Sequence, residues 1–220
     1  FFRFLGFWVG DGYTNDYHNT ERVGLTFNSK TEVELCNIYK KIIEDEFRIE
    51  KTTIYNHKNS NAIDLYFRDK PLRIWLSEHF RREWRGKIIP NWFYGISKKQ
   101  FEKFIQGWTE SDGYTDFLDR TGIVTKERDL AMKAQLLGFM HKRIIGLKRF
   151  RVNEKDYYKL IIPKGEKHSK IEGDYVITKF LKIQEVKRDS RTVLYNLEVD
   201  DDKSYCTGLL SLHNCQIHKH

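Results

Sequence analysis

The chain has 220 residues, of which 40% are hydrophobic and 15% aromatic, which is enough for a packed core and argues against intrinsic disorder. Its formal net charge of +8 favours a polyanionic partner, most often nucleic acid. No apolar run is long enough to span a bilayer, and the largely apolar residues 1–5 meet Asp11 too soon for a signal peptide, so no membrane partner is expected.

The first predicted element is a helix over residues 2–10, which ends at Asp11-Gly12, where glycine can take the left-handed position after a helix. The spacing of apolar residues then predicts a strand at 23–29 and an amphipathic helix at 30–47. Two strands and a third helix complete this half of the chain, at residues 52–56, 62–68 and 71–80.

The same order of elements returns in the second half. Ser97 is an N-cap candidate for a helix over residues 98–111, although residues 100 and 101 do not predict a strong capping box. A strand at 123–125, a helix at 126–145 and a hairpin of strands at 147–152 and 157–162 follow. The predicted fold class is therefore α+β, built from two pseudo-symmetric αββαββ units.

An internal sequence repeat supports this division. Asp11-Gly12-Tyr13-Thr14 recurs 101 residues later (112 minus 11) as Asp112-Gly113-Tyr114-Thr115. Small residues stand five positions and one position before each aspartate: Gly6, Gly10, Gly107 and Ser111. Small residues four apart form a flat stripe on a helix, and two such stripes allow two helix backbones to approach closely. We therefore expect Asp11 and Asp112 to lie side by side at the end of a helix pair.

These repeated segments resemble the motifs of the LAGLIDADG homing endonucleases. The matching stretches are residues 4–12 and 105–113, and the lead-in Lys87-Ile88-Ile89-Pro90 is similar to the run before the second motif in intein-borne members. We assign residues 1–163 to an endonuclease domain on this basis. The resemblance implies a monomer that cuts both strands of a specific double-stranded DNA site, with its two sheets forming a DNA-binding saddle.

The resemblance also implies the catalytic site. Asp11 and Asp112 are the candidate catalytic metal ligands, each serving one DNA strand, and the backbone carbonyls of Gly10 and Ser111 are possible further ligands. Hydrolysis of a phosphodiester needs an activated water and a stabilised leaving oxygen, which a divalent cation supplies, and Mg²⁺ (or Mn²⁺) suits carboxylate oxygens. A nearby basic residue is also implied, with Lys51, Lys148 and Arg149 as candidates. The alternative is that the two aspartates only cap the helix ends.

DNA contacts are expected from the two hairpins, because a two-stranded ribbon fits the major groove. The candidates are Tyr55, Lys58, Asn61, Tyr66 and Arg68 in the first hairpin, and Lys148, Arg149, Arg151, Lys155 and Lys159 in the second. Strand side chains alternate between faces, so only about half of these residues can face DNA. For any single residue, an exposed polar position without a role is the alternative.

After Pro163 the sequence changes to short alternating segments, which predict strands at 175–183 and 193–199. The final run ends in His213-Asn214-Cys215. This region resembles the C-terminal part of an intein, with the Hint fold shared by hedgehog autoprocessing domains, in which a last strand precedes His, Asn and a nucleophile. The resemblance assigns residues 164–214 to the C-terminal part of a splicing domain and 215–220 to the start of the host protein, or C-extein.

The chemistry of protein splicing accounts for these last residues. The thiol of Cys215 can accept an acyl group, and the side-chain amide of Asn214 can cyclise onto its own carbonyl and cut the bond before Cys215. His213 can polarise that carbonyl or donate a proton. The host extein protein and an N-terminal intein half, which this sequence lacks, are the implied partners. Asn196 and Lys203 stand where many members have Asp and His, which implies either less efficient splicing or a variant mechanism.

The cysteines Cys36, Cys206 and Cys215 are odd in number and lack metal-ligand spacing, which argues against a disulfide framework and a zinc site. A reducing compartment is therefore expected, the cytoplasm or, for a eukaryotic or viral host, the nucleus. A helical pattern from the first residue without a methionine suggests a fragment. One alternative is a catalytically inactive LAGLIDADG-fold nucleic-acid-binding module in a degenerate intein, against which both aspartates argue. Another is a hedgehog-like domain without a nuclease, against which the repeat argues.

Overall fold

The computed structural model describes residues 1–15, 21–81, 86–163, 169–173, 175–178, 204–207 and 210–213. The chain divides into two compact units, Phe1–Val176 and Ile177–His220, and each is described by itself. Within the described ranges, no helix combines the length and the hydropathy that crossing a membrane requires.

The first repeat folds as three helices and a four-stranded antiparallel sheet in the order β1-β2-β4-β3. Its elements are α1 (Phe2–Asp11), β1 (Gly12–Asn15), β2 (Arg22–Asn28), α2 (Val33–Phe47), β3 (Thr53–Asn56), β4 (Ala62–Arg68) and α3 (Lys70–Phe80). Asp69 caps the N-terminus of α3, because its carboxylate accepts a hydrogen bond of 2.8 Å from the backbone N–H of Leu72. Pro71 occupies the first turn, where no N–H is needed.

The second repeat has the same topology, with a four-stranded antiparallel sheet in the order β5-β6-β8-β7. Its elements are the 3₁₀ helix η2 (Asn91–Gly95), α4 (Lys98–Asp112), β5 (Gly113–Thr115), β6 (Thr121–Thr125), α5 (Arg128–Met140), β7 (Gly146–Val152) and β8 (Lys155–Ile162). The predicted α+β class and the two matching repeats are confirmed.

Helix α4 starts with a complete capping box. The Ser97 hydroxyl accepts a hydrogen bond of 3.3 Å from the backbone N–H of Gln100, and the Gln100 side chain accepts one of 2.7 Å from the backbone N–H of Ser97. The expectation that no strong capping box forms here was wrong, because a glutamine side chain reaches the N-cap backbone as a glutamate does.

The glycines that follow Asp11 and Asp112 are extended and not left-handed, which corrects the sequence-based expectation. Gly12 has φ −88° and ψ 155°, and Gly113 has φ −83° and ψ 152°. Each leads directly from its helix into a strand. Glycine is needed for space, because a Cβ on Gly12 would lie 2.3 Å from the Trp8 ring and one on Gly113 would lie 2.1 Å from the Thr109 carbonyl oxygen.

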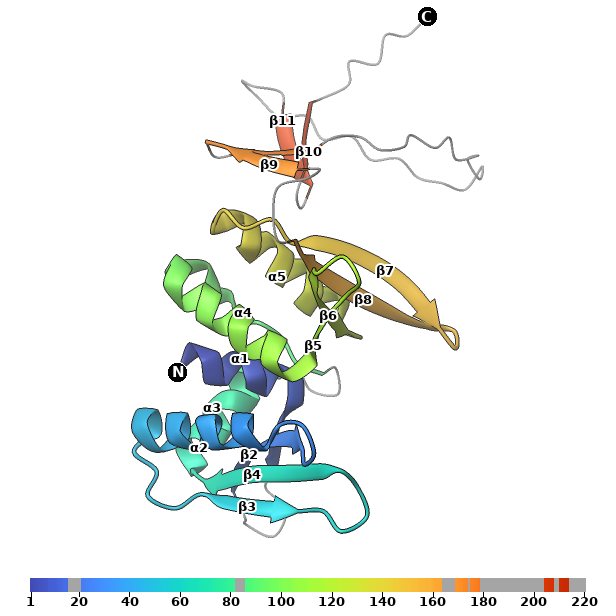
Figure 1. The fold of residues 1–220 in the computed structure, drawn as a ribbon. Helices are drawn as coiled ribbons and strands as arrows, with labels where there is room; N and C mark the ends of the chain where they lie inside the picture. Colours follow the sequence, from blue (N-terminus) through green and yellow to red (C-terminus); the bar gives the residue numbers. More distant parts are fainter. Residues whose placement is uncertain are drawn as a thin grey trace, which may run out of the picture. The chain divides into compact units, whose positions relative to one another are not determined.

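The two repeats meet along α1 and α4, which lie side by side between the two sheets (Figure 1). A Cβ on Gly6 would lie 1.9 Å from the carbonyl oxygen of Phe104, and one on Gly107 would lie 1.9 Å from that of Arg3. The small-residue stripes therefore bring the two backbones into contact, as predicted. On one side of the pair the Arg3 guanidinium donates two hydrogen bonds, of 2.7 and 2.8 Å, to the carboxylate of Glu110.

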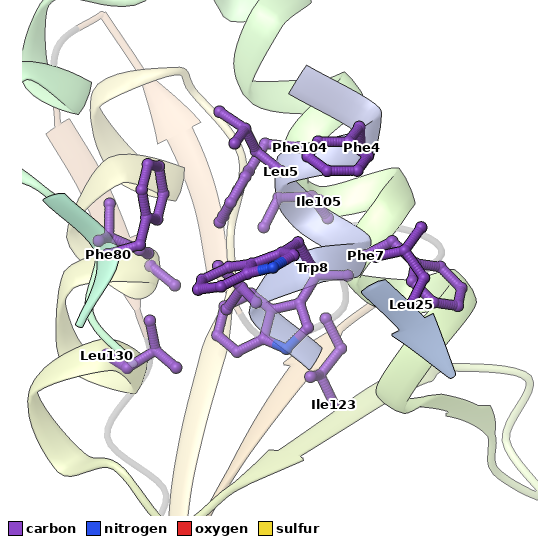
Figure 2. Packing of buried hydrophobic residues seen from close by; sticks show 14 of the residues in the cluster. Phe4, Leu5, Phe7, Trp8, Leu25, Phe80, Phe104, Ile105, Ile123 and Leu130 are labelled. Carbon is purple, nitrogen blue, oxygen red and sulfur yellow. The ribbon is translucent and has the colours of Figure 1, made fainter. Parts of the chain in front are cut away.

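A single hydrophobic core surrounds this helix pair. Figure 2 shows side chains of α1 and α4 packed with residues from both sheets and from α3 and α5. The labelled members are Phe4, Leu5, Phe7, Trp8, Leu25, Phe80, Phe104, Ile105, Ile123 and Leu130, all buried. Because this core continues from one repeat to the other, it holds the ends of α1 and α4 in a fixed relation.

The first sheet has one face against the helices and one face away from them. Directly paired residues share a face, and the helix-side face carries the buried Val23, Leu25, Phe27, Ile63, Leu65 and Phe67. The opposite face, here called the first open face, consists of Tyr13, Asn15, Arg22, Gly24, Thr26, Asn28, Thr53, Tyr55, Ala62, Asp64, Tyr66 and Arg68.

The second sheet is divided in the same way. Its helix-side face carries Ile123, Leu147, Tyr158, Leu160 and Ile162, which are buried or packed against the core. The second open face consists of Tyr114, Gly122, Val124, Gly146, Lys148, Phe150, Val152, Lys155, Tyr157, Lys159 and Ile161. Each repeat thus presents one sheet surface that none of its own helices covers.

Beyond Pro163 the described residues form two short hairpins. β9 (Ser169–Glu172) and β10 (Tyr175–Thr178) form a two-stranded sheet, and in the second unit β11 (Ser204–Thr207) pairs antiparallel with β12 (Leu210–His213). The strand predicted from residue 175 is present as far as Thr178. The strand predicted at 193–199, and Asn196 and Lys203, lie outside the described residues.

Candidate functional site

Asp11 and Asp112 are the last residues of α1 and α4, and the helix pair brings them together. A Cβ on Gly10 would lie 1.9 Å from Ser111 Oγ and 3.0 Å from Asp112 Oδ2, so the end of α1 touches the end of α4. The negative ends of two helix dipoles meet at the same place. The sequence-based expectation that these two carboxylates neighbour each other is confirmed.

The electrostatics of the two carboxylates show that they interact. Burial, and then the neighbouring Asp112 carboxylate, raise the pKa of Asp11 to about 6, although Lys87 acts in the opposite direction. Burial also raises the pKa of Asp112, opposed by a hydrogen bond of 3.3 Å from Trp108 Nε1 and by Lys87. Two acids with raised pKa at one point resist the loss of their protons unless a cation joins them.

Lys87 binds the C-terminal end of α1. Its Nζ donates hydrogen bonds to the carbonyl oxygens of Trp8, at 2.7 Å, and Gly10, at 2.8 Å, and sits 5.0 Å from the Trp8 ring centroid. Burial lowers the pKa of Lys87 to about 8, and the charges of Asp112 and Asp11 oppose this shift. Lys87 is therefore a cation whose proton is held less firmly than that of an exposed lysine.

Sequence reasoning missed Lys87 as the basic residue of this site. The three residues considered for that role are elsewhere: Lys51 is exposed just before β3, and Lys148 and Arg149 are exposed on β7. The available signal was the lead-in Lys87-Ile88-Ile89-Pro90, since its lysine precedes the second motif. An antiparallel β-bridge between Arg81 and Lys87, and a backbone hydrogen bond from the N–H of Ile88 to the carbonyl oxygen of Phe80, fix this segment beside the end of α3.

The donors at this site fit a hard divalent cation. They are carboxylate and carbonyl oxygens, and in the described part of the chain no group of three or more His, Cys, Asp or Glu forms a fuller metal cage. Mg²⁺ is typically held by one or two carboxylates and keeps several waters, which matches two acids at a helix junction. The Gly10 carbonyl accepts a hydrogen bond from Lys87, and its second lone pair remains for another partner.

The raised pKa of Asp11 predicts an unusual effect on stability. A carboxyl with a raised pKa binds its proton more tightly in the folded chain, so its favourable contribution is present below about pH 4 and is lost as pH rises through about 6. At about pH 7.5 in EDTA, Asp11→Asn should therefore stabilise the protein by about 1 kcal/mol, or roughly 2–4 °C in Tm. This free energy is smaller than the pKa shift alone would give, because Asp11 is exposed and solvent screens its charge. Thermal unfolding with EDTA or Mg²⁺ would measure it.

The difference in Tm between Asp11→Asn and the wild type should depend on both pH and metal. The Tm advantage of the variant should shrink at about pH 4, where Asp11 of the wild type is protonated, and in Mg²⁺, where the cation offsets the repulsion. A variant less stable than the wild type under all these conditions would contradict the description of these acids as a repelling pair.

The predicted DNA-binding residues of the first hairpin lie on the first open face or at its turn. Tyr55, Tyr66 and Arg68 belong to the first open face, and Lys58 and Asn61 lie in the exposed turn between β3 and β4. Asp64 stands among them and is bound by Thr26 Oγ1 at 2.8 Å and by His57 Nε2 at 2.9 Å.

The second hairpin divides its candidates between two faces. Lys148, Lys155 and Lys159 belong to the second open face, as Lys148 pairs with Lys159 and Val152 with Lys155. Arg149 and Arg151 belong to the helix-side face, where both bind the carboxylate of Asp156, at 2.6 and 2.8 Å. Arg149 and Asp156 also line a cavity with Arg128 and Met132 of α5.

Other residues of the open faces escaped sequence reasoning. The ring of Tyr13 covers Gly24 and that of Tyr114 covers Gly122, since a Cβ on these glycines would lie 2.2 and 2.6 Å from the respective ring. Lys159 Nζ sits 4.6 Å from the Tyr114 ring centroid, and the Arg22 guanidinium 4.5 Å from that of Tyr66. For Tyr13 and Tyr114, the available signal was the tyrosine that follows Asp-Gly in both copies of the repeat.

The candidate splicing residues are only partly described. His213 is the last residue of β12 and pairs with Ser204 of β11, while Asn214 and Cys215 lie outside the described residues. The resemblance placed the histidine after the last strand, whereas β12 includes His213 as its last residue.

Comparison with known proteins gives one curated relative. The uncharacterized protein MJ0043 of Methanocaldococcus jannaschii is 28% identical over an alignment of 258 residues, which takes in 98% of this chain. The chain spans 30% of the length of that relative. No protein-family model matches the chain.

Solved structures with a similar architecture include those of the homing endonuclease I-DmoI. Its complex with DNA and Mn has a TM-score of 0.54 at 18% identity, covering 74% of this chain and 88% of that one. Its complex with DNA and Ca has a TM-score of 0.55 at 17% identity, and the match covers 74% of this chain and 82% of that one. The structure of an I-DmoI variant with its target DNA and Mg has a TM-score of 0.54 at 17% identity, and the match covers 74% of this chain and 87% of that one. This chain therefore has the α+β fold, with antiparallel sheets, of the LAGLIDADG endonuclease structures.

Proposed function

We propose that the first compact unit, Phe1–Val176 (unit 1), is a site-specific double-strand DNA endonuclease that requires Mg²⁺ or Mn²⁺. The observation that carries the proposal is the junction of α1 and α4, where Asp11, Asp112 and Lys87 meet at the boundary between two sheets with open faces. The fold supports it, since structures of I-DmoI were solved with DNA and Mn, Ca or Mg. A divalent metal cofactor is consistent with those structures.

The residues of the junction have separate tasks in this proposal. Asp11 and Asp112 hold the cations, which activate water and stabilise the leaving oxygen when bound. One carboxylate at the end of the motif helix of each repeat, α1 or α4, allows each repeat to act on one strand of the duplex. Lys87 holds its proton at Nζ beside both acids and stabilises the negative charge that develops on the phosphate, because a preorganised cation in a partly buried site acts strongly.

The partner in this proposal is double-stranded DNA bound by a monomer. Both open faces carry cations beside aromatic rings, Arg22 over Tyr66 and Lys159 over Tyr114. A β-ribbon fits the major groove of B-form DNA, whereas the deep and narrow major groove of A-form RNA does not admit it. The formal net charge of +8 also attracts the chain electrostatically to the polyanionic duplex.

The test of the endonuclease is direct. The folded chain is incubated with a plasmid library of random inserts in Mg²⁺, Mn²⁺ or EDTA, and new DNA ends are sequenced. We expect cuts at one long sequence in either metal and none in EDTA. The alternative, a module that binds nucleic acid but has lost cleavage, predicts specific binding without new ends, and the presence of Asp11, Asp112 and Lys87 together argues against it.

Charge neutralisation on opposite faces of β7 and β8 tests the assignment of the DNA surface. Lys148→Gln with Lys159→Gln removes two charges from the second open face, and Arg149→Gln with Arg151→Gln removes two from the helix-side face. The lysine pair should weaken DNA binding and flatten the slope of log K against log salt by about 0.9 per lost phosphate contact. The arginine pair should change the slope much less. Equal slopes for both variants would move the DNA surface elsewhere.

We further propose that residues 164–214 are the C-terminal part of a protein-splicing element. The support is the hairpin β11–β12, which ends at His213, immediately followed in sequence by Asn214 and Cys215. In this proposal the host extein and an N-terminal splicing half are the partners.

Removal of the cyclising amide tests this second proposal. Once the chain is completed with an N-terminal half, Asn214→Ala should abolish scission before Cys215, because no other group can form the succinimide. His213→Ala should slow the step through the loss of carbonyl polarisation. Mass spectrometry of the released fragment is the measurement, and a mature end at Asn214 or its succinimide is expected in the unsubstituted chain. An Asn214→Ala chain that still cuts before Cys215 would refute the proposal.

A further inference from the structure

The two open faces differ in chemistry. Among the described strand residues, the first open face has no Val, Ile, Leu or Phe. Its residue Asp64 is hydrogen-bonded to Thr26 on the same face and to His57, which directly follows β3. The second open face has no Asp or Glu in its described strands and carries four large apolar residues: Val124, Phe150, Val152 and Ile161. Two copies of one repeat have therefore diverged toward different surfaces.

The apolar residues concentrate on the β7–β8 hairpin, which is the longer ribbon of the two. β7 has 7 residues and β8 has 8, against 4 and 7 for β3 and β4. Phe150 stacks on its cross-strand partner Tyr157, with ring centroids 5.7 Å apart and an interplanar angle of 24°. Val152 follows on the same face toward the turn, and its side chain is 46% exposed.

This apolar strip is not part of the core. The core of the second repeat lies on the other face of the same strands, where Leu160 is buried and Tyr158 and Leu147 pack toward α5. Lysines flank the strip on the open face, with Lys148 and Lys159 paired on one side and Lys155 opposite Val152 on the other. Lys126 Nζ sits 5.8 Å from the Tyr157 ring centroid. An apolar strip bordered by cations suits a ligand with apolar groups between phosphates.

We infer that the β7–β8 ribbon reads thymine through its 5-methyl groups, with Phe150 and Val152 as specificity-determining residues. In the major groove the thymine methyl is the apolar mark on the base edges, and apolar side chains are the groups that recognise it. The lysines bind the flanking phosphates and fix the register of the ribbon. The half-site bound by the second repeat is thus rich in thymine, while the polar first open face reads hydrogen-bonding edges. The inference rests on the proposed function, which supplies the duplex.

Deletion of methyl groups from the DNA tests the inference without any change in base pairing. A duplex is first enriched from a randomised library by binding to the full chain in EDTA. Its thymines are then replaced by deoxyuridine, in one half-site at a time, and the Kd is measured. In one half-site each contacted methyl should be worth about fourfold in Kd, from about 0.8 kcal/mol per buried methyl-sized group. Replacement in the other half should change Kd much less.

Matched variants assign the effect to the ribbon. Phe150→Ala with Val152→Ala should bind the thymine and deoxyuridine duplexes equally, because the groups that touch the methyls are gone. Met132→Ala on the opposite, α5 side of the same sheet should keep the full thymine preference. The inference is overturned if deoxyuridine has no effect in either half-site, or if the thymine preference survives Phe150→Ala with Val152→Ala.

Cleavage of the same duplex separates this inference from the function on which it rests. If Mg²⁺ still supports cutting but deoxyuridine has no effect, the endonuclease stands and the thymine contact is wrong. If no duplex is enriched and none is cut, the proposed function fails and takes the inference with it.

Discussion

Asp11→Asn and Asp112→Asn should each reduce double-strand cleavage by at least about 10²-fold, because each removes one negative ligand from the proposed metal site at the helix junction. If each acid serves one strand, a single variant should convert a supercoiled target plasmid to the nicked form and leave little linear product. The double variant should leave the plasmid supercoiled. Gel electrophoresis of the three plasmid forms over time measures all these outcomes.

A matched control makes this result specific. Asp45→Asn on the exposed side of α2 makes the same chemical change far along the chain from both motifs and should leave cleavage within about twofold of the wild type. DNA binding in EDTA should persist in the junction variants, since the open faces are unchanged. Full cleavage by both Asp11→Asn and Asp112→Asn would remove the carboxylate pair from the mechanism.

The overall fold could be predicted from sequence because two local signals coincided. The repeat of Asp-Gly-Tyr-Thr supplied the symmetry, and the small residues before each aspartate supplied the helix contact that Gly6 and Gly107 now show. Helix and strand positions followed from apolar spacing, with boundaries that differ by a few residues, as in α5, which spans Arg128–Met140 where residues 126–145 were expected.

The details of the site could not be predicted in the same way. Lys87 reaches Trp8 and Gly10 from 79 and 77 positions away, a contact with no signal in local spacing. Strand register decides which face of the sheet a side chain occupies. Lys148 and Arg149 are adjacent in sequence, but Lys148 lies on the second open face and Arg149 on the helix-side face. Asp156, which binds Arg149 and Arg151, decides that these arginines form ion pairs on the helix side.

The helix junction combines a tight packing contact with charges that oppose folding. Desolvation raises the pKa of both acids and lowers that of Lys87, so each group is less favourable as an ion here than in water. The packing of α1 against α4 must offset the free-energy cost of burying these charges. That packing depends on the glycines Gly6 and Gly107. Stability and the geometry of the site therefore depend on the same small positions.

Gly6→Ala and Gly107→Ala should each destabilise unit 1 by about 3 kcal/mol, equivalent to roughly 6–12 °C in Tm, and should reduce cleavage as well. The new Cβ would lie 1.9 Å from a backbone carbonyl oxygen of the facing helix, of Phe104 or of Arg3. A rotamer change cannot relieve a clash with backbone, so the helices must separate and the two acids with them. Thermal unfolding and plasmid cleavage measure the two effects.

The sign of this effect is what makes the prediction informative. Alanine normally favours a helix over glycine by about 1 kcal/mol, so an uncrowded helix would be stabilised by the same substitution. Gly95→Ala in η2 is the matched control, because no atom lies within 4 Å of its added Cβ, and its stability should change by less than about 0.5 kcal/mol. A rise in Tm for Gly6→Ala or Gly107→Ala would mean that the two backbones are not in contact. The carboxylate pair would then lose its structural basis, because the approach of α1 to α4 is what brings Asp11 to Asp112.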